Sequence, residues 1–319
     1  MAITLESQTP ATARKAVAFC CDANYLPYAL FAAAQITALH PARDFDICIC
    51  DVEMPEIPRS LAGLHLRACK LTADGLLDGF GTDARRTMSM YLRLLLPDAF
   101  AGAYDRILYL DADIYVQGGD LSALLAVEMG PNPVAAVRDN QQWRTPGRMP
   151  AEFKAAGLGV APYFNSGVML IDCARWQADA VLNHCIEFGT ACKGRLLRHD
   201  QTLLNCVLHR HWAELSPVWN WQYSWAARLF EAMQGAHIVH FIGPLKPWND
   251  TDGQYPPRFS RALAGFLAVH FPTLPPIAVG KGLAPNSSRL RRMMVKHLLS
   301  GRAMARYLAR FPDPLTVQQ

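Results

Sequence analysis

The stretch of sequence that most constrains the fold is an apolar run from Ile107 to Val116 that is interrupted by two aspartates. The residues before Asp111 have high strand propensity, and so do the residues after Asp113. Both carboxylates are therefore expected where a buried strand ends and bends. Two neighbouring carboxylates repel each other and resist desolvation, so a site that keeps both ionised needs a cation beside them.

A divalent metal ion is the simplest cation for such a pair. Oxygen ligands suit Mg²⁺ or Mn²⁺, and Mg²⁺ usually binds through one or two carboxylates while substrate phosphates complete its shell. An Asp-x-Asp pair at a strand end can also simply cap a turn. The pattern alone leaves both interpretations open, and other parts of the chain have to decide between them.

Composition indicates a globular protein, because 51% of the 319 residues are hydrophobic and 18% are charged. We favour a single large domain for this length. The net charge of +4 is modest and does not indicate a nucleic-acid-binding surface. The nine cysteines lie mostly in apolar runs, which is typical of reduced core residues in a cytosolic protein. Residues 1–14 lack a signal-peptide pattern, and no run reaches the ~18 apolar residues of a membrane-spanning helix.

The first 52 residues predict a parallel pair of strands. Two apolar strands, at 16–21 and 45–52, flank an alanine-rich helical pattern, and such a unit usually pairs its strands through the crossover helix. Ligands of parallel sheets bind at the carboxyl ends of the strands, which is where Asp22, Asn24 and Tyr25 stand. No glycine-rich phosphate loop follows the first strand, so a nucleotide would be read by side chains.

Further elements are expected along the chain from periodicity and from turn residues. The expected helices are 57–66, 87–96, 177–188 and 202–208, the expected strands are 66–71, 133–137, 163–172 and 236–241, and 140–161 is expected to be a mobile loop. Four tryptophans between Trp212 and Trp225 suggest an aromatic surface for stacking on sugar rings, although a tryptophan-rich core is the alternative.

Three polar residues in these elements have two interpretations each. Arg93 lies among leucines and either pairs with a core acid or contacts a phosphate or sugar. Asp200 either caps the helix that follows or belongs to a site. His240 ends the last strand, where a histidine is more often a satisfied polar residue than a ligand. However, two carboxylates and an imidazole are reasonable ligands for Mn²⁺, and Lys246 follows in the same loop as a candidate phosphate clamp.

The C-terminal part of the chain is basic. Residues 281–310 contain eight lysines and arginines and no acid, and Leu290, Met293, Met294, Leu298 and Leu299 can share one helical face. A basic amphipathic helix of this kind can lie on an anionic membrane surface. The alternative is an ordinary terminal helix packed on the domain. We therefore predict a catalytic domain over 1–280 and a membrane-attaching tail over 281–319.

Taken in order, these motifs resemble the retaining glycosyltransferases of family 8, over about residues 16–248. The resemblance rests on Tyr109-Leu110-Asp111-Ala112-Asp113, Phe164-Asn165-Ser166-Gly167-Val168, His199-Asp200-Gln201 and the run from His240 to Trp248. It implies an α/β fold with one Rossmann-like, GT-A type nucleotide-sugar-binding domain and a mixed, mostly parallel sheet. It also implies transfer of galactose or glucose from a UDP-sugar to a cell-envelope glycan or glycolipid, such as lipopolysaccharide core, at the inner face of the membrane.

By position, the resemblance assigns Mn²⁺ or Mg²⁺ to Asp111, Asp113 and His240. The residues implied to contact the nucleotide, its phosphates or the donor sugar are Cys20, Asp22, Asn24, Tyr25, Arg93, Asp111, Ala112, Asp113, Asp139, Asn165, Gly243 and Lys246. The residues implied to take part in catalysis are Arg93, Asp200, Gln201 and Lys246. Asp22-Ala23-Asn24 departs from the Asp-Asp-Asn that is frequent in the family.

Two other functions remain open at this point. A non-catalytic protein of the same fold would bind a UDP-sugar without turning it over. A metal-dependent nucleotidyl or phosphoryl transferase would also use paired acids, but the chain lacks a glycine-rich phosphate loop. Retention of the anomeric configuration is compatible with a covalent intermediate or with front-face attack, and we favour the latter because no isolated acid is placed as a nucleophile.

Overall fold

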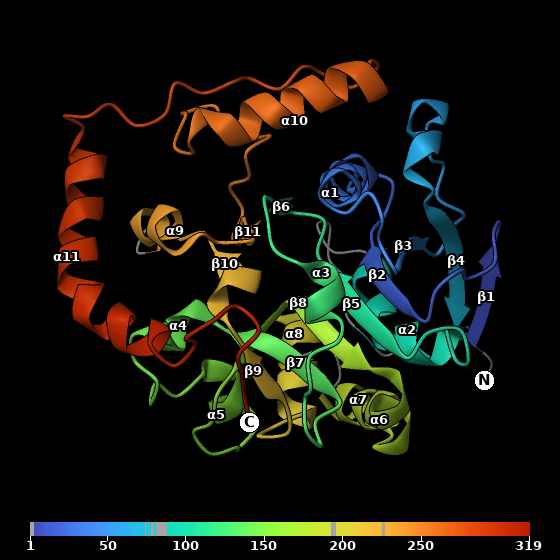
Figure 1. Ribbon diagram of the computed structural model, residues 1–319. Coiled ribbons are helices and arrows are strands. Elements are labelled where there is room, and N and C mark those ends of the chain that lie inside the picture. The colour runs from blue at the N-terminus through green and yellow to red at the C-terminus, as the bar shows by residue number, and fades with distance from the viewer. Residues whose placement is uncertain (1–2, 74, 78–79, 81–87, 193–195, 225–226) are drawn as a thin grey trace.

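The computed structural model describes residues 3–73, 75–77, 80, 88–192, 196–224 and 227–319 (Figure 1). The strands are β1 Ile3–Ser7, β2 Lys15–Cys20, β3 Asp46–Asp51, β4 Arg67–Ala73, β5 Arg106–Leu110, β6 Ile114–Val116, β7 Val134–Arg138, β8 Phe164–Asp172, β9 Ala213–Leu215, β10 Trp221–Gln222, β11 Ile238–His240 and β12 Val317–Gln318. The α-helices are α1 Leu26–Leu39, α2 Leu92–Ala99, α3 Leu121–Leu124, α4 Asn140–Trp143, α5 Ala151–Ala155, α6 Cys173–Ala178, α7 Val181–Cys192, α8 His199–Val207, α9 Arg228–Gln234, α10 Pro257–His270 and α11 Ser288–Leu308.

The large sheet has the strand order β1-β4-β3-β2-β5-β8-β7-β9-β12. The predicted crossover through α1 makes β2 and β3 parallel, and β5 and β4 extend this parallel group on either side. The prediction of one α/β domain with a mixed sheet is confirmed. The described pairs of this sheet are, however, not mostly parallel: four are parallel and four antiparallel, because β1, β8 and β12 run against their neighbours.

The antiparallel strand β8 is what concentrates polar residues at one edge of the sheet. The chain leaves β7 at the edge where the parallel strands end, forms α4 and α5 there, and starts β8 from the same edge (Figure 1). As a result, the first residues of β8 stand beside the last residues of β5, as the pairing of Val168 with Leu110 shows. A parallel β8 would have carried Asn165 and Ser166 to the opposite edge.

Two hydrophobic clusters cover the two faces of this sheet. Alternate residues of β2 point to opposite sides, so Val17 and Phe19 pack with α1, whereas Ala16 and Ala18 pack with α2 and α6–α8. Both faces are therefore buried, which explains the continuous apolar runs of the inner strands. None of the nine cysteines, all of which are among the described residues, forms a disulfide bond, and eight of them are buried.

Several sequence-based boundaries differ from the structure. Residues 57–66 form only a short 3₁₀ helix, Arg59–Leu64, which ends at His65 with a positive φ of 48°. The helix predicted over 177–188 is divided into α6 and α7 at Ala180, whose φ is 47°. The stretch 140–161 contains α4 and α5. Thr87, the first residue of a predicted helix, and Trp225, one of the four clustered tryptophans, lie outside the described residues.

The prediction of an aromatic surface between Trp212 and Trp225 is wrong for the described tryptophans. Trp212, Trp219 and Trp221 are all buried, and the last two are at most 1% exposed. Their burial is possible because backbone carbonyl groups satisfy the indole N–H groups: that of Trp219 donates to Pro314 and that of Trp221 donates to Ala227. The tryptophan-rich core, the alternative interpretation, is what the chain forms.

The C-terminal helix α11 has one face on the domain and one in solvent. Met293, Met304 and Tyr307 are buried, and the Tyr307 hydroxyl donates to Glu214 Oε1 at 3.0 Å. The expectation that Met293 shares a face with Leu298 and Leu299 is therefore wrong. Within the described part of the chain, no helix is long and apolar enough to cross a membrane.

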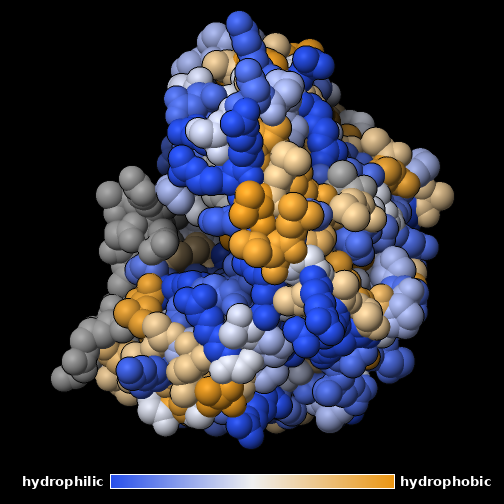
Figure 2. Space-filling view, turned by 90° about the vertical axis from the view of Figure 1, so that its left-hand side faces the viewer, coloured by the Kyte–Doolittle hydropathy of each residue, from blue (hydrophilic) through white to orange (hydrophobic). Residues whose placement is uncertain are grey.

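Four apolar residues remain exposed on the outer side of this helix: Met294, Val295, Leu298 and Leu299, with exposed fractions from 50% to 82%. We call them the α11 patch. Figure 2, which views the side of the molecule that carries α11, shows a hydrophobic patch bordered by hydrophilic residues. Such a concentration of exposed apolar groups typically marks an interaction surface.

Candidate active site

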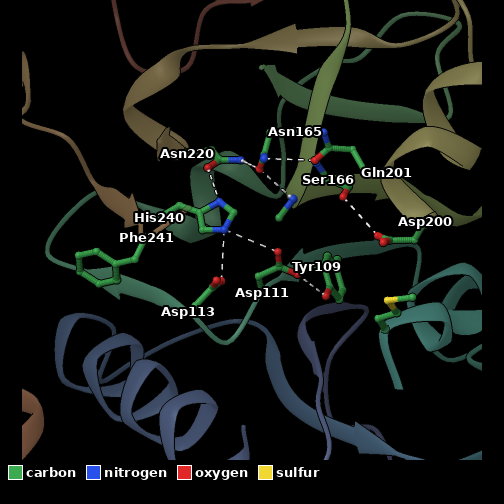
Figure 3. A network of polar contacts seen from close by, with 12 residues as sticks. Tyr109, Asp111, Asp113, Asn165, Ser166, Asp200, Gln201, Asn220, His240 and Phe241 are labelled. Atoms are coloured by element: carbon green, nitrogen blue, oxygen red, sulfur yellow. Dashed lines mark hydrogen bonds and ion pairs between the residues drawn. The ribbon is translucent and has the colours of Figure 1, made fainter. Parts of the chain in front are cut away.

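Asp111, Asp113 and His240 converge although about 130 residues separate the acids from the histidine (Figure 3). The two acids follow β5, and β11 pairs with β6 so that His240 stands opposite Ile114, the residue after Asp113. His240 Nε2 lies 3.2 Å from Asp113 Oδ1 and 3.7 Å from Asp111 Oδ2. One ligand atom from each of the three residues lies within 4.8 Å of the others. Two carboxylate oxygens and an imidazole nitrogen are a donor set that fits Mn²⁺ or Mg²⁺.

Gly167 makes this convergence possible. Its carbonyl oxygen accepts the Asp111 backbone N–H at 2.8 Å, which ties the start of β8 to the first acid. A Cβ at this position would lie 2.3 Å from His240 Cε1 and 2.7 Å from Asp111 Oδ2. Any larger residue would therefore displace the histidine or the acid, which explains the glycine in the Asn-Ser-Gly motif.

Arg93 pairs with two acids of the site rather than standing alone among leucines. The side chain is buried, and its guanidinium lies 3.0 Å from Asp111 Oδ1 and 3.1 Å from Asp200 Oδ2. It also lies 4.3 Å from the centre of the Tyr109 ring, whose hydroxyl donates to Asp111. Burial alone would lower the pKa of Arg93, but the two carboxylates raise it above its ordinary value. One buried cation thus joins the two carboxylates.

Asp200 is not the cap of α8. It lies inside the first turn of this helix, behind Arg198, and its side chain accepts a hydrogen bond from Ser166 Oγ at 3.3 Å in addition to its ion pair with Arg93. Burial raises the pKa of Asp200, and the Arg93 guanidinium opposes that rise. The carboxylate is therefore directed at the start of β8 and the end of β5.

Amide side chains connect Asp139 to the same region. Gln201 Nε2 lies 3.5 Å from Asp139 Oδ2, and Gln201 Oε1 accepts from Asn165 Nδ2 at 3.2 Å. Asp139 also pairs with Arg198 at 3.1 Å and caps α4. The three residues lie on β8, on α8 and just after β7, so their meeting depends on the antiparallel course of β8.

Lys246 and Gly243 come from the loop after β11. The Lys246 ammonium forms an ion pair with Asp113 and donates to the carbonyl oxygen of Phe241, and Gly243 forms the turn with a φ of 85°. Burial by itself would raise the pKa of Asp113, but Lys246 and His240 hold it well below the usual range of an aspartate. This loop therefore places a cation directly beside the second acid.

The residues after β2 lie at the same edge of the sheet. Asp22 accepts the backbone N–H groups of Asn24 and Tyr25 at 3.0 and 3.2 Å and so shapes the turn into α1. The Tyr25 ring is in edge contact with Trp248, with 6.2 Å between the ring centres. Burial raises the pKa of Tyr25, and the carboxylate of Asp113 adds to the rise, which connects this turn to the two acids.

Two other predicted contact residues lie at or just after the ends of β2 and β5. Cys20 is the last residue of β2, and Ala112 separates the two acids. The structure thus gathers every predicted site residue at the carboxyl ends of β2, β5, β7 and β11, at the start of α2, β8 and α8, or in the loop after β11. Asn220, which contacts His240, was not predicted from the sequence. The sequence shows it only as an asparagine between two tryptophans.

A cavity of about 830 Å³ lies elsewhere, between α9, the start of α10 and α11. Its lining includes Arg228, Arg258 and Lys281, and none of the predicted site residues. Glu231 and Arg258 are paired with each other at 2.8 Å inside it. The candidate site is therefore defined by converging side chains and not by this cavity.

Comparison with known proteins places this arrangement in a family. The model of the family described as glycosyl transferase family 8 matches residues 16–252, which include the whole candidate site. The chain belongs to glycosyl transferase family 8. Relatives of the chain include the lipopolysaccharide glucosyltransferase WaaO of Escherichia coli (strain K12), which is 30% identical over 72% of this chain and 66% of its own length.

Two other relatives align over shorter stretches. General stress protein A of Bacillus subtilis (strain 168) is 33% identical over 51% of this chain and 60% of its own length. The lipopolysaccharide 1,3-galactosyltransferase of Salmonella typhimurium is 31% identical over 53% of this chain and 52% of its own length. The chain thus spans about half to two thirds of the length of these relatives.

Solved structures show the same fold. The galactosyltransferase LgtC, crystallised with donor and acceptor sugar analogs, superposes with a TM-score of 0.65 over 78% of this chain and 95% of its own, at 23% identity. The glycosyltransferase GlyE of Streptococcus pneumoniae TIGR4, in its apo form, has a TM-score of 0.53 over 93% of this chain and 64% of its own, at 19% identity. Both are compatible with the single GT-A-like domain that the family 8 motifs predict.

Proposed function

We propose that this chain transfers galactose or glucose from a UDP-sugar to a cell-envelope glycan or glycolipid, with retention of the anomeric configuration and with the help of a divalent cation. The observation that carries the proposal is the convergence of Asp111, Asp113 and His240 in a member of family 8. Relatives named as a lipopolysaccharide glucosyltransferase and a lipopolysaccharide 1,3-galactosyltransferase support a hexose donor and a lipopolysaccharide acceptor.

Asp111, Asp113 and His240 would hold the cation, and their donor atoms fit Mn²⁺ or Mg²⁺. When bound, such an ion neutralises the negative charge that develops on a departing diphosphate. Lys246 adds a second positive charge at the same place, because its ammonium already lies beside Asp113. Stabilisation of developing charge is usually the largest single contribution to catalysis, so these residues form the leaving-group side of the site.

The uridine would be bound by Asp22, Asn24 and Tyr25, which come just after Cys20 at the end of β2. Tyr25 is 37% exposed and offers an aromatic face beside the Asp22 turn. Gly243 would let the backbone approach the phosphates. Its positive φ favours glycine, and the space beside it is open, since a Cβ at this position would meet no atom within 4 Å.

Arg93, Asp139, Asn165, Asp200 and Gln201 would bind the donor hexose between β8 and α8. The proposed role of Asp200 is electrostatic: a buried carboxylate stabilises positive charge at the anomeric carbon as the bond to the diphosphate breaks. The oxygen of the Gln201 amide is already held by Asn165 and by the Ser166 backbone N–H, so this side chain has a fixed orientation.

A panel of UDP-sugars with Mn²⁺ or Mg²⁺ tests the proposal. Release of UDP, followed by mass spectrometry, is expected to be fastest with one UDP-hexose, and glucose and galactose differ in a single hydroxyl orientation that a few hydrogen bonds discriminate. Metal-dependent UDP binding without turnover for any donor and any lipopolysaccharide acceptor would favour a non-catalytic UDP-sugar-binding protein. Absence of UDP binding would contradict both functions.

We also propose that the α11 patch attaches the protein to the anionic inner face of the cell membrane. The patch is apolar, and the arginines of α11 lie on the same helix without an acid among them. Basic amphipathic helices bind such membranes through buried apolar area and electrostatic attraction. The contact of Tyr307 with Glu214 and the pairing of β12 with β9 tie this segment to the domain, so removing it would test stability as well as attachment.

Replacing Leu298 and Leu299 together with serine is a cleaner test of membrane attachment. We expect the affinity for anionic lipid vesicles, measured by sedimentation, to fall at least about tenfold, because two exposed leucines no longer enter the lipid. UDP release should not change. Val269→Ser, an equally exposed apolar residue on α10, is the matched control. Unchanged vesicle binding of the Leu298/Leu299 variant would contradict attachment through the α11 patch.

A further inference from the structure

We propose that Asn220 fixes the protonation site of His240, so that Nδ1 carries a proton and Nε2 is the nitrogen left to bind a cation beside the two acids. Asn220 is fully buried and lies after the 3₁₀ helix Pro217–Trp219, and its side-chain oxygen is 3.0 Å from His240 Nδ1. The inference concerns the imidazole itself. Its consequence for a bound cation rests on the proposed function.

The direction of the hydrogen bonds begins at a backbone group. The Gly167 N–H can only donate, and it lies 3.1 Å from the side-chain oxygen of Asn165. This contact fixes which end of the Asn165 amide is the oxygen. The same oxygen lies 2.9 Å from the side chain of Asn220, so the Asn220 atom that faces it has to be the NH₂ group.

The other end of the Asn220 amide is therefore its oxygen, and this end faces His240 Nδ1 (Figure 3). A carbonyl oxygen accepts only, so Nδ1 has to donate and must carry a proton. In the neutral imidazole the second nitrogen, Nε2, is then unprotonated. The backbone N–H of Gly167 thus determines the protonated nitrogen of His240 through two asparagine side chains.

A second backbone group supports the same orientation. The Ser166 N–H donates to Gln201 Oε1 at 3.3 Å, and that oxygen also accepts from the NH₂ group of Asn165 at 3.2 Å. If the Asn165 amide were reversed, its oxygen would face Gln201 Oε1 and its NH₂ group would face the Gly167 N–H. Both contacts would then be repulsive, at positions where the side chains are at most 9% exposed.

Nε2 is consequently the nitrogen that faces the acids, and a cation held there would take the place of any proton that Nε2 shares with Asp113. Nε2 is 3.2 Å from Asp113 Oδ1, and the imidazole is 4% exposed, so water reaches it poorly. A metal-bound histidine usually donates its other N–H to an oxygen that sets the tautomer, and removing such a partner typically costs about 10- to 100-fold in metal affinity. Asn220 supplies that oxygen here and is a positioning residue that acts through His240.

The tautomer can be measured directly by ¹⁵N–¹H correlation spectroscopy on histidine-labelled, metal-free protein, with His240 assigned by comparison with His240→Ala. His240 of the wild type is expected to carry a proton on Nδ1, whether Nε2 is unprotonated or also shares a proton with Asp113. Asn220→Asp keeps an acceptor for the Nδ1 proton and should preserve this pattern. Asn220→Leu removes the acceptor and should shift the population toward the Nε2-protonated form.

The consequence for the cation is measured with Mn²⁺ alone, by electron paramagnetic resonance titration. Asn220→Leu is expected to weaken Mn²⁺ binding by about 10- to 100-fold. Asn132→Leu is the matched control: Asn132 is also buried, but it bonds to the Met129 carbonyl far from the site, so both readouts should remain as in the wild type.

The two readouts separate the inference from the proposed function. An unprotonated Nδ1 of His240 in the wild type would overturn the inference whatever the metal result, and this measurement needs no variant that has to fold. An unchanged tautomer in Asn220→Leu would overturn it as well. The expected tautomer pattern in a protein that binds no Mn²⁺ would instead uphold the role of Asn220 and contradict the proposed metal site.

Discussion

Replacing Asp111 and Asp113 together with asparagine is expected to lower kcat/KM for sugar transfer by at least about 10³-fold while the protein stays folded. Both substitutions keep the shape of the side chain but remove the negative charge that would hold a cation at the diphosphate. Asparagine at these positions also leaves His240 as the one remaining ligand of the three residues that converge. The measurement is initial-rate kinetics with the preferred UDP-hexose and acceptor, and circular dichroism reports on the fold.

The matched control for this pair is Asp252→Asn. Asp252 is an exposed aspartate whose closest cationic partner, Arg289, is 3.9 Å away, and it lies outside the candidate site. We expect it to retain wild-type kinetics. Transfer by the Asp111/Asp113 variant within about tenfold of the wild type would exclude the proposed role of the two acids, because a lost metal site costs far more than that.

Replacing Arg93 with methionine is expected to lower the free energy of unfolding by about 3–5 kcal/mol. Arg93 is buried, and its guanidinium is paired with Asp111 and Asp200. Methionine fills a similar volume but leaves two carboxylates close together without that cation. Removing one partner of a buried ion pair costs more than the pair contributes, because the remaining charge stays desolvated. Urea denaturation, followed by tryptophan fluorescence, measures the change.

The destabilisation of Arg93→Met should depend on pH. Burial already raises the pKa of Asp200, and loss of the Arg93 cation removes the contact that opposes this rise. An acid whose pKa is higher in the folded than in the unfolded protein stabilises the fold below its unfolded pKa, and this stabilisation is lost as the pH rises through the folded pKa. The stability difference from the wild type should therefore grow as the pH rises above about 4, the ordinary pKa of an aspartate.

Two further variants test the cause. Combining Arg93→Met with Asp200→Asn removes one of the unpaired charges, so the double variant should be more stable than Arg93→Met alone. Arg14→Met is the surface control: Arg14 pairs with Asp105 in solvent, and its loss should change the stability much less. Equal losses for Arg14→Met and Arg93→Met would show that Arg93 does not balance buried acids.

Local sequence patterns predicted the right element at many site positions. The apolar run before Asp111 became β5, the strand-helix-strand unit became β2, α1 and β3 with parallel pairing, and the run before Phe241 became β11. These predictions succeed because alternation and strand propensity depend on neighbouring residues. The motif around Gly167 also carried real information, since the tight contact with His240 admits no side chain there.

Other predictions failed where burial by distant segments decides. Trp219 and Trp221 looked like a sugar-stacking surface, but carbonyl groups of Pro314 and Ala227 accept their N–H groups inside the core. The apolar residues of α11 looked like a single face, but packing on the domain takes Met293 and leaves Leu298 and Leu299 outside. Composition shows that a residue is apolar and does not show what will cover it.

The sequence by itself determined the chemistry that this protein carries: two aspartates after a buried strand, a histidine at the end of another, and the ordered motifs of family 8. Only the tertiary structure decided that β8 runs antiparallel between β5 and β7, that β11 pairs with β6 in the register that sets His240 beside Asp113, and that Asn220 contacts that histidine. The physical reason is that strand periodicity specifies which side of a strand is buried, whereas the neighbour, direction and register of a strand depend on contacts between residues far apart in the chain.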